Sequence, residues 1–390
     1  MVSTSSAYKA AIKAASRDMR NLSVTVDGST YSNSAVRSIK LTESVSDNPD
    51  RLLPGVAACA SIEATVVGIL SPGVIGTEMT ARAGVVTSSG VEYVPLGVFV
   101  VQNIKSDPGT NLTTIVGYDR MCLLDGTDFV HERDEEASGE ETTGEETTPV
   151  KISFLDLLNA VVPFNNSGVV SWANTPDVDN FFVVNRPLDE LHGYNCKELL
   201  GYIAGAHGKF ARFTRSGGLE FAWYEHTGIT IPATSIYMDG LELRSVVDMD
   251  DTITLYSNDN LEDTGYSGVY TNDLIGSLFA ETYFNVANSS ASPGSLKFRG
   301  DMSLQAGDIV SVETKNGGHR NFAISEITMY FGSGFYATAE CHALSQSVTH
   351  KLTATQRDIS RLKKVYRIAE ETTEEEGGTT EGDGTEGGTT

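Results

Sequence analysis

The most regular pattern in the chain is an alternation of apolar and polar residues in short segments separated by turn residues. Between Leu22 and Thr127, segments rich in Val, Thr, Ile and Tyr are separated by Asp27-Gly28, Ser89-Gly90 and Asp107-Pro108-Gly109. A period of two residues with turn residues between the segments is typical of antiparallel strands. This pattern predicts a tube-like β-barrel domain over residues 21–127.

One hairpin within this segment, from Glu92 to Met121, is apolar on both faces. Its first strand carries Val94, Leu96, Val98 and Val100 on one face and Tyr93, Phe99 and Val101 on the other. We therefore expect another part of the chain, or a second copy, to cover it. The hairpin ends on Asp119-Arg120. We interpret this pair as an ion pair or a backbone anchor, because the sequence displays no partner base for catalysis.

The pattern changes after residue 127. Residues 128–150 include a Glu-rich tract with no apolar residue larger than Ala, which predicts a flexible surface loop that can be deleted without unfolding the protein. Residues 151–245 predict an α+β insertion domain. In it, one helix begins at Ser153 and ends before Pro163, and Asn195 with Glu198 forms a capping box before a second helix. Two strands follow around Ser216-Gly217-Gly218.

Alternation returns in residues 246–349, which predict a second tube-like β-barrel domain. Three strands are expected around Asn316-Gly317-Gly318 and Gly332-Ser333-Gly334. The apolar parity changes near Ser325-Glu326, and this change predicts a β-bulge that bends the strand.

Helical spacing occurs at both ends of the chain. Residues 1–20 predict an N-terminal helix, and residues 350–370 predict a C-terminal amphipathic helix, followed by a disordered Glu/Thr/Gly tail over 371–390. The C-terminal helix is too short to be stable alone. We expect it to contribute four buried contacts to an oligomer interface, at Leu352, Ile359, Leu362 and Tyr366.

Composition narrows the classes of function. The chain has 390 residues with 40% hydrophobic content, and its 28 basic and 52 acidic residues give a net charge of −24. Stable nucleic-acid binding requires clustered Lys and Arg, which the sequence lacks. The sequence displays no signal peptide and no membrane span, so we expect synthesis in a cytoplasm.

Candidate chemistry is sparse. Four separated cysteines, Cys59, Cys122, Cys196 and Cys341, fit reduced structural thiols better than a disulfide framework or a zinc site. The segment GYIAGAHGKF lacks the residues of a phosphate-binding loop, and DMDDTITLYSNDNLED lacks the glycine of a calcium loop. Scattered histidines, such as His207, His226 and His319, stand beside turn residues. We predict no enzyme activity and no catalytic, cofactor-binding or metal site.

Several segments resemble one known family, the tail hub or tail-tip proteins of long-tailed bacteriophages, which are related to baseplate hubs and type VI secretion spikes. The matching segments are YKAAIKAASRDMR, EYVPLGVFVV with TTIVGYDRM, KELLGYIAGAHGKFARFTRSGGLEF, and GDMSLQAGDIVSV with FAISEITMYFGSGF. They occur in the family's order across most of residues 8–345. Many relatives carry a peptidoglycan-degrading domain or a fibre region after the hub, and this chain departs from that pattern.

The resemblance implies a homotrimer at the tail tip of the virion, assembled in the host cytoplasm. It implies two tube-like barrels per chain, so that a trimer presents six barrels to the six-fold ring of the distal tail or tail tube protein. Fibre or spike proteins, and the tape-measure protein, are further expected partners, and genomic DNA passes through the channel without stable binding. Two alternatives remain: a carbohydrate-binding adhesin, favoured by exposed Trp and Tyr clustered on a loop face, and a hydrolase, favoured by a pocket joining Glu225, His226 and another carboxylate.

Overall fold

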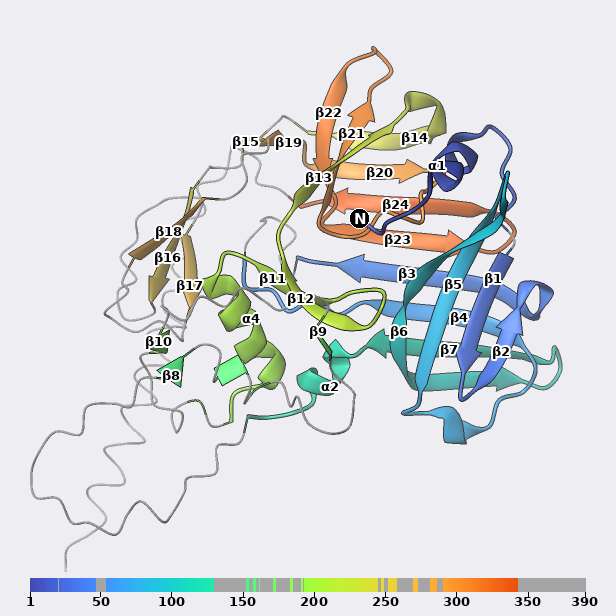
Figure 1. The fold of residues 1–390 in the computed structure, drawn as a ribbon, viewed down its shortest axis with the longest axis horizontal. Helices are drawn as coiled ribbons and strands as arrows, with labels where there is room; N and C mark the ends of the chain where they lie inside the picture. The colour runs from blue at the N-terminus through green and yellow to red at the C-terminus, as the bar shows by residue number, and fades with distance from the viewer. Residues whose placement is uncertain are drawn as a thin grey trace, which may run out of the picture. The chain divides into compact units, whose positions relative to one another are not determined.

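The structure is a computed structural model that describes residues 1–19, 21–46, 54–129, 152–153, 157–158, 161, 171–172, 183–184, 191, 193–244, 247–248, 252–257, 269–272, 281–285 and 290–342. The described residues form a mainly β fold (Figure 1). Its strands are β1 (Asn21–Val26), β2 (Ser29–Ser32), β3 (Val36–Ser44), β4 (Ser61–Val67), β5 (Glu78–Thr87), β6 (Gly90–Asp107), β7 (Leu112–Asp119), β8 (Ile152–Ser153), β9 (Ser171–Trp172), β10 (Val183–Val184), β11 (Phe210–Phe213), β12 (Gly218–Ala222), β13 (Glu225–Ile231), β14 (Ile236–Leu243), β15 (Val247–Asp248), β16 (Thr252–Ser257), β17 (Val269–Asn272), β18 (Glu281–Asn285), β19 (Ser290–Ala291), β20 (Gly294–Phe298), β21 (Asp308–Glu313), β22 (His319–Ala323), β23 (Glu326–Phe331) and β24 (Phe335–Cys341). The α-helices are α1 (Ser6–Lys13), α2 (Met121–Asp125) and α4 (Cys196–Ala206), and short 3-10 turns are η1 (Asn33–Ala35), η2 (Pro72–Val74) and η5 (Ala233–Ser235).

An eleven-stranded antiparallel sheet is the largest element. Its strand order is β14-β20-β24-β23-β3-β4-β7-β6-β5-β1-β2. The turns that the sequence predicts lie where expected, since Asp27-Gly28 joins β1 to β2 and Asp107 begins the connection from β6 to β7. Asp27 and Gly28 have φ values of 46° and 71°. This left-handed pair matches the twist of a two-residue hairpin.

The two predicted β domains meet within this sheet at the pairing of β3 with β23. In Figure 1 the blue strand β3 lies beside the orange strand β23, with Leu41 opposite Met329. Both side chains are buried in one core that draws residues from both segments. Strands β20, β23 and β24 of the C-terminal segment therefore share a sheet and a core with the strands of residues 21–127, while the closure of each segment into a barrel stays a prediction.

Two strands, β13 and β14, bear on the boundary predicted at residue 246. β13 pairs in parallel with β21, and β14 pairs antiparallel with β20. Both lie in the range assigned to the insertion, but their hydrogen-bond partners belong to the C-terminal β segment. Since a strand belongs to the sheet that satisfies its backbone groups, these pairings favour an earlier start of the second β segment, and the domain bounds stay a prediction.

The bulge predicted near Ser325-Glu326 is a passage between two sheets. β22 pairs with β21 in a small sheet, whereas β23 pairs with β24 and β3 in the large one. Ser325 is fully buried, its N–H donates to the Glu340 carbonyl at 2.8 Å, and its carbonyl accepts from Val45 N–H at 2.9 Å. The change of apolar parity arises because the chain leaves one sheet and enters another.

The apolar first strand of the Glu92–Met121 hairpin, β6, is covered as expected over part of its length. Leu96 is an extra residue where β6 passes β5, so Val94 and Leu96 share the core with Phe99 and Val101. On the opposite face, half-buried Val98 lies against Gly217 in the turn between β11 and β12. The insertion therefore covers this face of β6.

The described part of the insertion packs in a second core around α4, which also includes Met121 and Leu124 of α2. Asn195 caps this helix by accepting from the Lys197 N–H at 3.0 Å. Glu198 accepts instead from the hydroxyl of Tyr202 at 3.1 Å. Gly201 allows α4 to approach the chain at Gly55, because a Cβ atom at this position would lie 2.5 Å from the Gly55 carbonyl oxygen.

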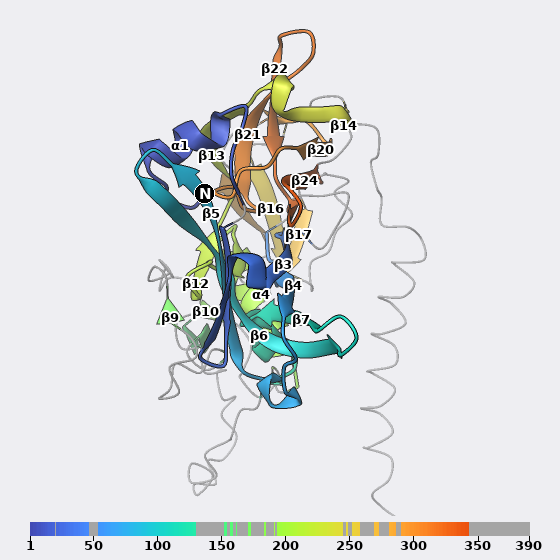
Figure 2. The ribbon, with the colours of Figure 1, turned by 90° about the vertical axis from the view of Figure 1, so that its right-hand side faces the viewer.

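The N-terminal helix α1 is shorter than the predicted 1–20, and it packs through buried Tyr8 and Ile12. Figure 2 shows it beside one end of β5, with which it is in contact. The acidic tract and the C-terminal helix and tail lie outside the described residues. No helix among the described residues is long and apolar enough to cross a membrane.

Candidate functional site

The polar groups that the sequence singles out lie at the junction of the large sheet, the insertion and the C-terminal β segment. Asp119, at the end of β7, is 5% exposed. Its carboxylate accepts from the Ala60 N–H at 2.8 Å and from the Met121 N–H at 2.9 Å. Burial raises the pKa of Asp119 to about 6, against the lowering effect of these two N–H donors. Asp119 thus fixes the start of β4 and the start of α2 to the end of β7.

Arg120 points to different partners. Its side chain binds Glu78 on β5 at 2.7 Å and donates to the Gly217 carbonyl at 2.9 Å. The architectural interpretation of Asp119-Arg120 is therefore correct, although these two residues pair with other groups and not with each other. Arg120 attaches the β11–β12 turn to the large sheet.

Arg215, in the same turn, makes the most buried ion pair among the described residues. It binds Glu43 of β3 at 2.7 and 3.1 Å, and it donates to the carbonyls of Met302 at 2.5 Å and Leu304 at 2.7 Å. The side chains of Arg215 and Glu43 are only 5% and 12% exposed. One guanidinium thus connects the insertion, β3 and the loop before β21.

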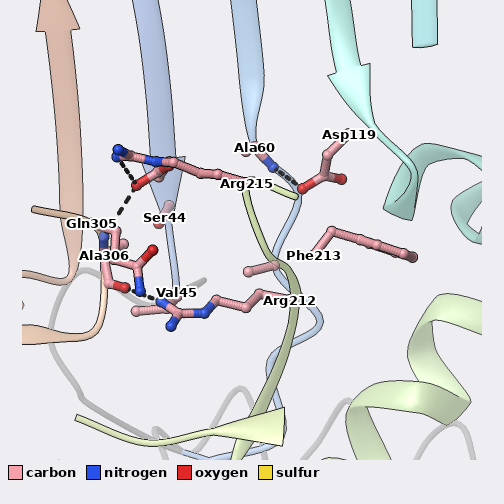
Figure 3. A pocket seen from close by; sticks show the side chains of 11 residues that line it. Ser44, Val45, Ala60, Asp119, Arg212, Phe213, Arg215, Gln305 and Ala306 are labelled. Carbon is pink, nitrogen blue, oxygen red and sulfur yellow. Dashed lines mark hydrogen bonds and ion pairs between the residues drawn. The ribbon is translucent and has the colours of Figure 1, made fainter. Parts of the chain in front are cut away.

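Arg212, on β11 three residues before Arg215, makes a second connection between the insertion and the loop before β21. Its Nε donates to Glu220 at 2.7 Å, and its Nη1 donates to the Ala306 carbonyl. Figure 3 shows Arg212 and Arg215 both reaching toward the Gln305–Ala306 segment, with Asp119 bound to Ala60 on the other side. The cavity between them has a volume of about 30 Å³.

This arrangement of bound carboxylates and arginines is more typical of a structural connection than of a catalytic site. The carboxylates of Glu43, Glu220 and Asp119 are each engaged by an arginine or by backbone N–H groups. A cavity of this size holds about one or two water molecules, not a substrate. The sequence displayed Asp119-Arg120, but it gave no signal that Arg215 and Glu43 would meet, because they lie 172 residues apart.

The residues of the hydrolase alternative are not assembled into this cavity. Glu225 and His226 are consecutive on β13, and both are exposed. The carboxylate nearest to them by register is Asp308, which is 2% exposed. Among the described residues, no group of His, Cys, Asp and Glu is placed to hold a metal ion.

Aromatic residues do gather, but on a sheet face. Tyr330 and Tyr336 stack at 4.6 Å between ring centroids, and Tyr237 meets Tyr336 edge-on at 6.3 Å. Lys297 lies over the Tyr336 ring at 5.1 Å. Trp223 packs against Phe210 and Tyr224 instead. Among the residues that the structure describes, the aromatic cluster thus consists of three tyrosines on β14, β24 and β23 of the large sheet, not on a loop face.

The remaining candidate residues are the four cysteines and the four residues of the predicted oligomer interface. All four cysteines are free, and burial raises the pKa of Cys341 to about 12. Its neighbour His342 pairs with Glu340 at 3.0 Å. The four predicted interface residues, Leu352, Ile359, Leu362 and Tyr366, lie outside the described residues.

Solved structures to which this chain is similar include phage tail proteins and a component of a secretion system. A 43 kDa tail protein of prophage MuSo2 from Shewanella oneidensis is 12% identical with a TM-score of 0.47, and the match covers 82% of this chain and 97% of that protein. A tail protein from Neisseria meningitidis MC58 is 11% identical, with a TM-score of 0.45 and coverage of 82% and 95%. An Escherichia coli component of the type VI secretion system, described as similar to the T4 tail proteins gp27 and gp5, is 12% identical with a TM-score of 0.40 and coverage of 85% and 77%.

The chain is similar to phage tail proteins. At these identities and scores, no residue role passes from those proteins to this chain. No protein-family model matches the sequence, and no curated protein sequence matches it.

Proposed function

We propose that this chain is a structural protein of a phage tail, a trimeric hub that joins the six-fold tail tube to a three-fold tip and lines the channel for DNA ejection. The observation that carries the proposal is where the family-like segments lie. Asp119-Arg120 comes from TTIVGYDRM, and Arg120 donates to a carbonyl in KFARFTRSGG. Arg212 and Arg215 come from KFARFTRSGG, and they donate to carbonyls in GDMSLQAGDIVSV. The segments that resemble the family are the ones that connect the three parts of the chain.

The exposed face of the large sheet supports the channel part of the proposal. Lys40 on β3 lies between Tyr330 and Glu63 by register, so a carboxylate accompanies this cation. At this position DNA phosphates would meet a cation that a carboxylate already accompanies. A polyanion in transit would meet mixed charges and hydroxyl groups there.

The expected interface places Leu352, Ile359, Leu362 and Tyr366 in trimer contacts. Light scattering of the purified chain should give a trimer, or a monomer that becomes trimeric on the tail. Ile359→Glu and Leu362→Glu should weaken assembly, because each large apolar side chain removed from water contributes about 1.5 to 3 kcal/mol. Lys315→Glu, in the exposed turn between β21 and β22, is the matched control and should leave assembly unchanged. A chain that is six-fold or strictly monomeric in a reconstruction of the mature particle would refute the hub.

The tyrosine cluster keeps one alternative open to test. A carbohydrate-binding adhesin would use the rings of Tyr237, Tyr330 and Tyr336 as a stacking platform. If so, Tyr330→Ala should abolish retention on host-cell polysaccharide. Under the hub proposal the unsubstituted chain should not be retained at all.

A further inference from the structure

A polar groove lies at one end of the large sheet, away from the junction described above. It has a volume of about 520 Å³ and is lined by Ser16, Arg17, Asp18, Met19, Arg299 and the Gly332–Phe335 turn. The lining comes from three segments: the chain after α1, the chain after β20, and the turn between β23 and β24. Its charged residues are two arginines and one aspartate, so it carries a net positive charge in a protein of net charge −24.

The two arginines are held in place by backbone carbonyls. Arg17 donates to the carbonyls of Ile12 at 3.2 Å, Gly300 at 2.8 Å and Arg299. Arg299 donates in return to the carbonyls of Ala14 at 3.2 Å and Ala15 at 2.8 Å. These bonds tie the chain after α1 to the chain after β20, and they fix both guanidiniums at the groove.

These bonds do not use all the donors. A guanidinium has more N–H groups than the carbonyls around Arg17 and Arg299 engage. Within the described ranges, neither arginine forms an ion pair with a carboxylate, whereas Arg120, Arg212 and Arg215 each do. Burial, followed by the charge of Arg299, lowers the pKa of Arg17 to about 10. The charge of Asp301 opposes this lowering of the Arg17 pKa, and the two arginines with Asp18 leave the groove lining with one net positive charge.

We propose that this groove binds an acidic polypeptide segment of a partner protein, whose carboxylates complete the ion pairs of Arg17 and Arg299. Planar guanidinium groups match carboxylates in geometry as well as in charge. The buried ring of Phe335 lies 5.5 Å from the Arg17 guanidinium, and this contact helps to hold the guanidinium in place. A volume of about 520 Å³ is large enough for several residues' side chains of such a segment. The inference is independent of the tail assignment.

Ser333 offers a test that leaves the arginine bonds intact. It is exposed at the tip of the β23–β24 turn and lines the groove, and no hydrogen bond of its side chain supports the fold. Ser333→Glu adds a negative charge at the opening, and Ser333→Gln is the matched neutral control. Arg299→Gln is a second variant, whose folding is checked by its melting temperature because Arg299 also binds the Ala14 and Ala15 carbonyls.

The probe is a fluorescently labelled hexaglutamate peptide, titrated against the full chain at low salt, with hexaglutamine as the neutral peptide. We expect hexaglutamate alone to bind. Its affinity should fall roughly tenfold in Ser333→Glu, stay unchanged in Ser333→Gln, and weaken as NaCl is raised. Equal binding of both peptides, or an unchanged affinity in Ser333→Glu, would overturn the proposal. Duplex DNA or inorganic phosphate that displaces the peptide at equal charge concentration would also overturn it, because the groove would then select anions in general.

Discussion

The Arg215–Glu43 pair allows the sharpest test of how the three parts of the chain are connected. Arg215→Met removes the guanidinium of a side chain that is 5% exposed, and it leaves the Glu43 carboxylate without its cation. Breaking a buried ion pair by removing one partner costs about 3 to 5 kcal/mol. The carbonyls of Met302 and Leu304 also lose their donor. We therefore expect a loss at the upper end of this range.

The double variant separates the charge from the carbonyl bonds. Glu43→Met with Arg215→Met removes both charges, so the uncompensated ion disappears, and part of the stability returns. The carbonyls of Met302 and Leu304 stay unpaired, at about 1 to 3 kcal/mol for each buried group. The double variant should thus lie between the wild type and Arg215→Met, with a coupling energy of about 2 kcal/mol or more.

The assay is unfolding in urea, followed by circular dichroism and by tryptophan fluorescence. Only coincident transitions permit a free energy of unfolding to be compared. Lys197→Met is the matched control, because Lys197 pairs with Asp125 at 2.9 Å with side chains 27% and 55% exposed. Such a pair contributes about 0.2 to 1 kcal/mol. If Arg215→Met costs no more than Lys197→Met, the three-part connection is not held as described.

Two other predictions follow from the same geometry. The pKa of Asp119 is about 6 in the folded chain against an ordinary 3.8, so the folded state binds more protons between these values and stability should fall as the pH rises from about 4 to 6. Measured as melting temperature across this range, the advantage of the wild type over Asp119→Asn should shrink with rising pH; growth of that advantage would mean that the N–H donors outweigh burial. Gly201→Ala should lower the free energy of unfolding by about 1 to 3 kcal/mol, because its Cβ would overlap a backbone carbonyl. Gly126→Ala, with open space around it, should be near neutral, and equal costs for both substitutions would contradict the close packing of α4.

The sequence predicted local structure well because local structure depends on nearby residues. Asp27-Gly28 specifies a tight turn by its backbone conformation, and Asn195 caps α4 through a bond two residues away. The alternation over residues 21–127 likewise indicated antiparallel strands. It could not indicate which strand lies beside β3, because alternation repeats in every strand and carries no partner identity.

The candidate site was harder to predict for the same reason. Asp119 and Arg120 attract attention as neighbours, yet each acts through a distant partner, and Arg215 looks like a surface residue in a glycine-rich turn. Its burial depends on the chain from Met302 to Leu304 folding over it. The change of apolar parity near Ser325 predicted a β-bulge. Parity alone cannot distinguish a bulge within one sheet from a chain that leaves one sheet and enters another.

The pairing of β3 with β23 also sets the order of events during synthesis. Thr42 and Thr328, whose hydroxyls meet at 3.2 Å across this seam, are separated by 286 residues. At roughly 5 to 20 residues per second, a ribosome needs about 15 to 60 s to make the intervening chain. Throughout that interval one edge of the nascent N-terminal sheet has no permanent neighbour, and such edges favour wrong pairings. The hydroxyl and lysine side chains on β3 would then keep this edge soluble and disfavour pairing with another chain until the last fifth of the chain is synthesised.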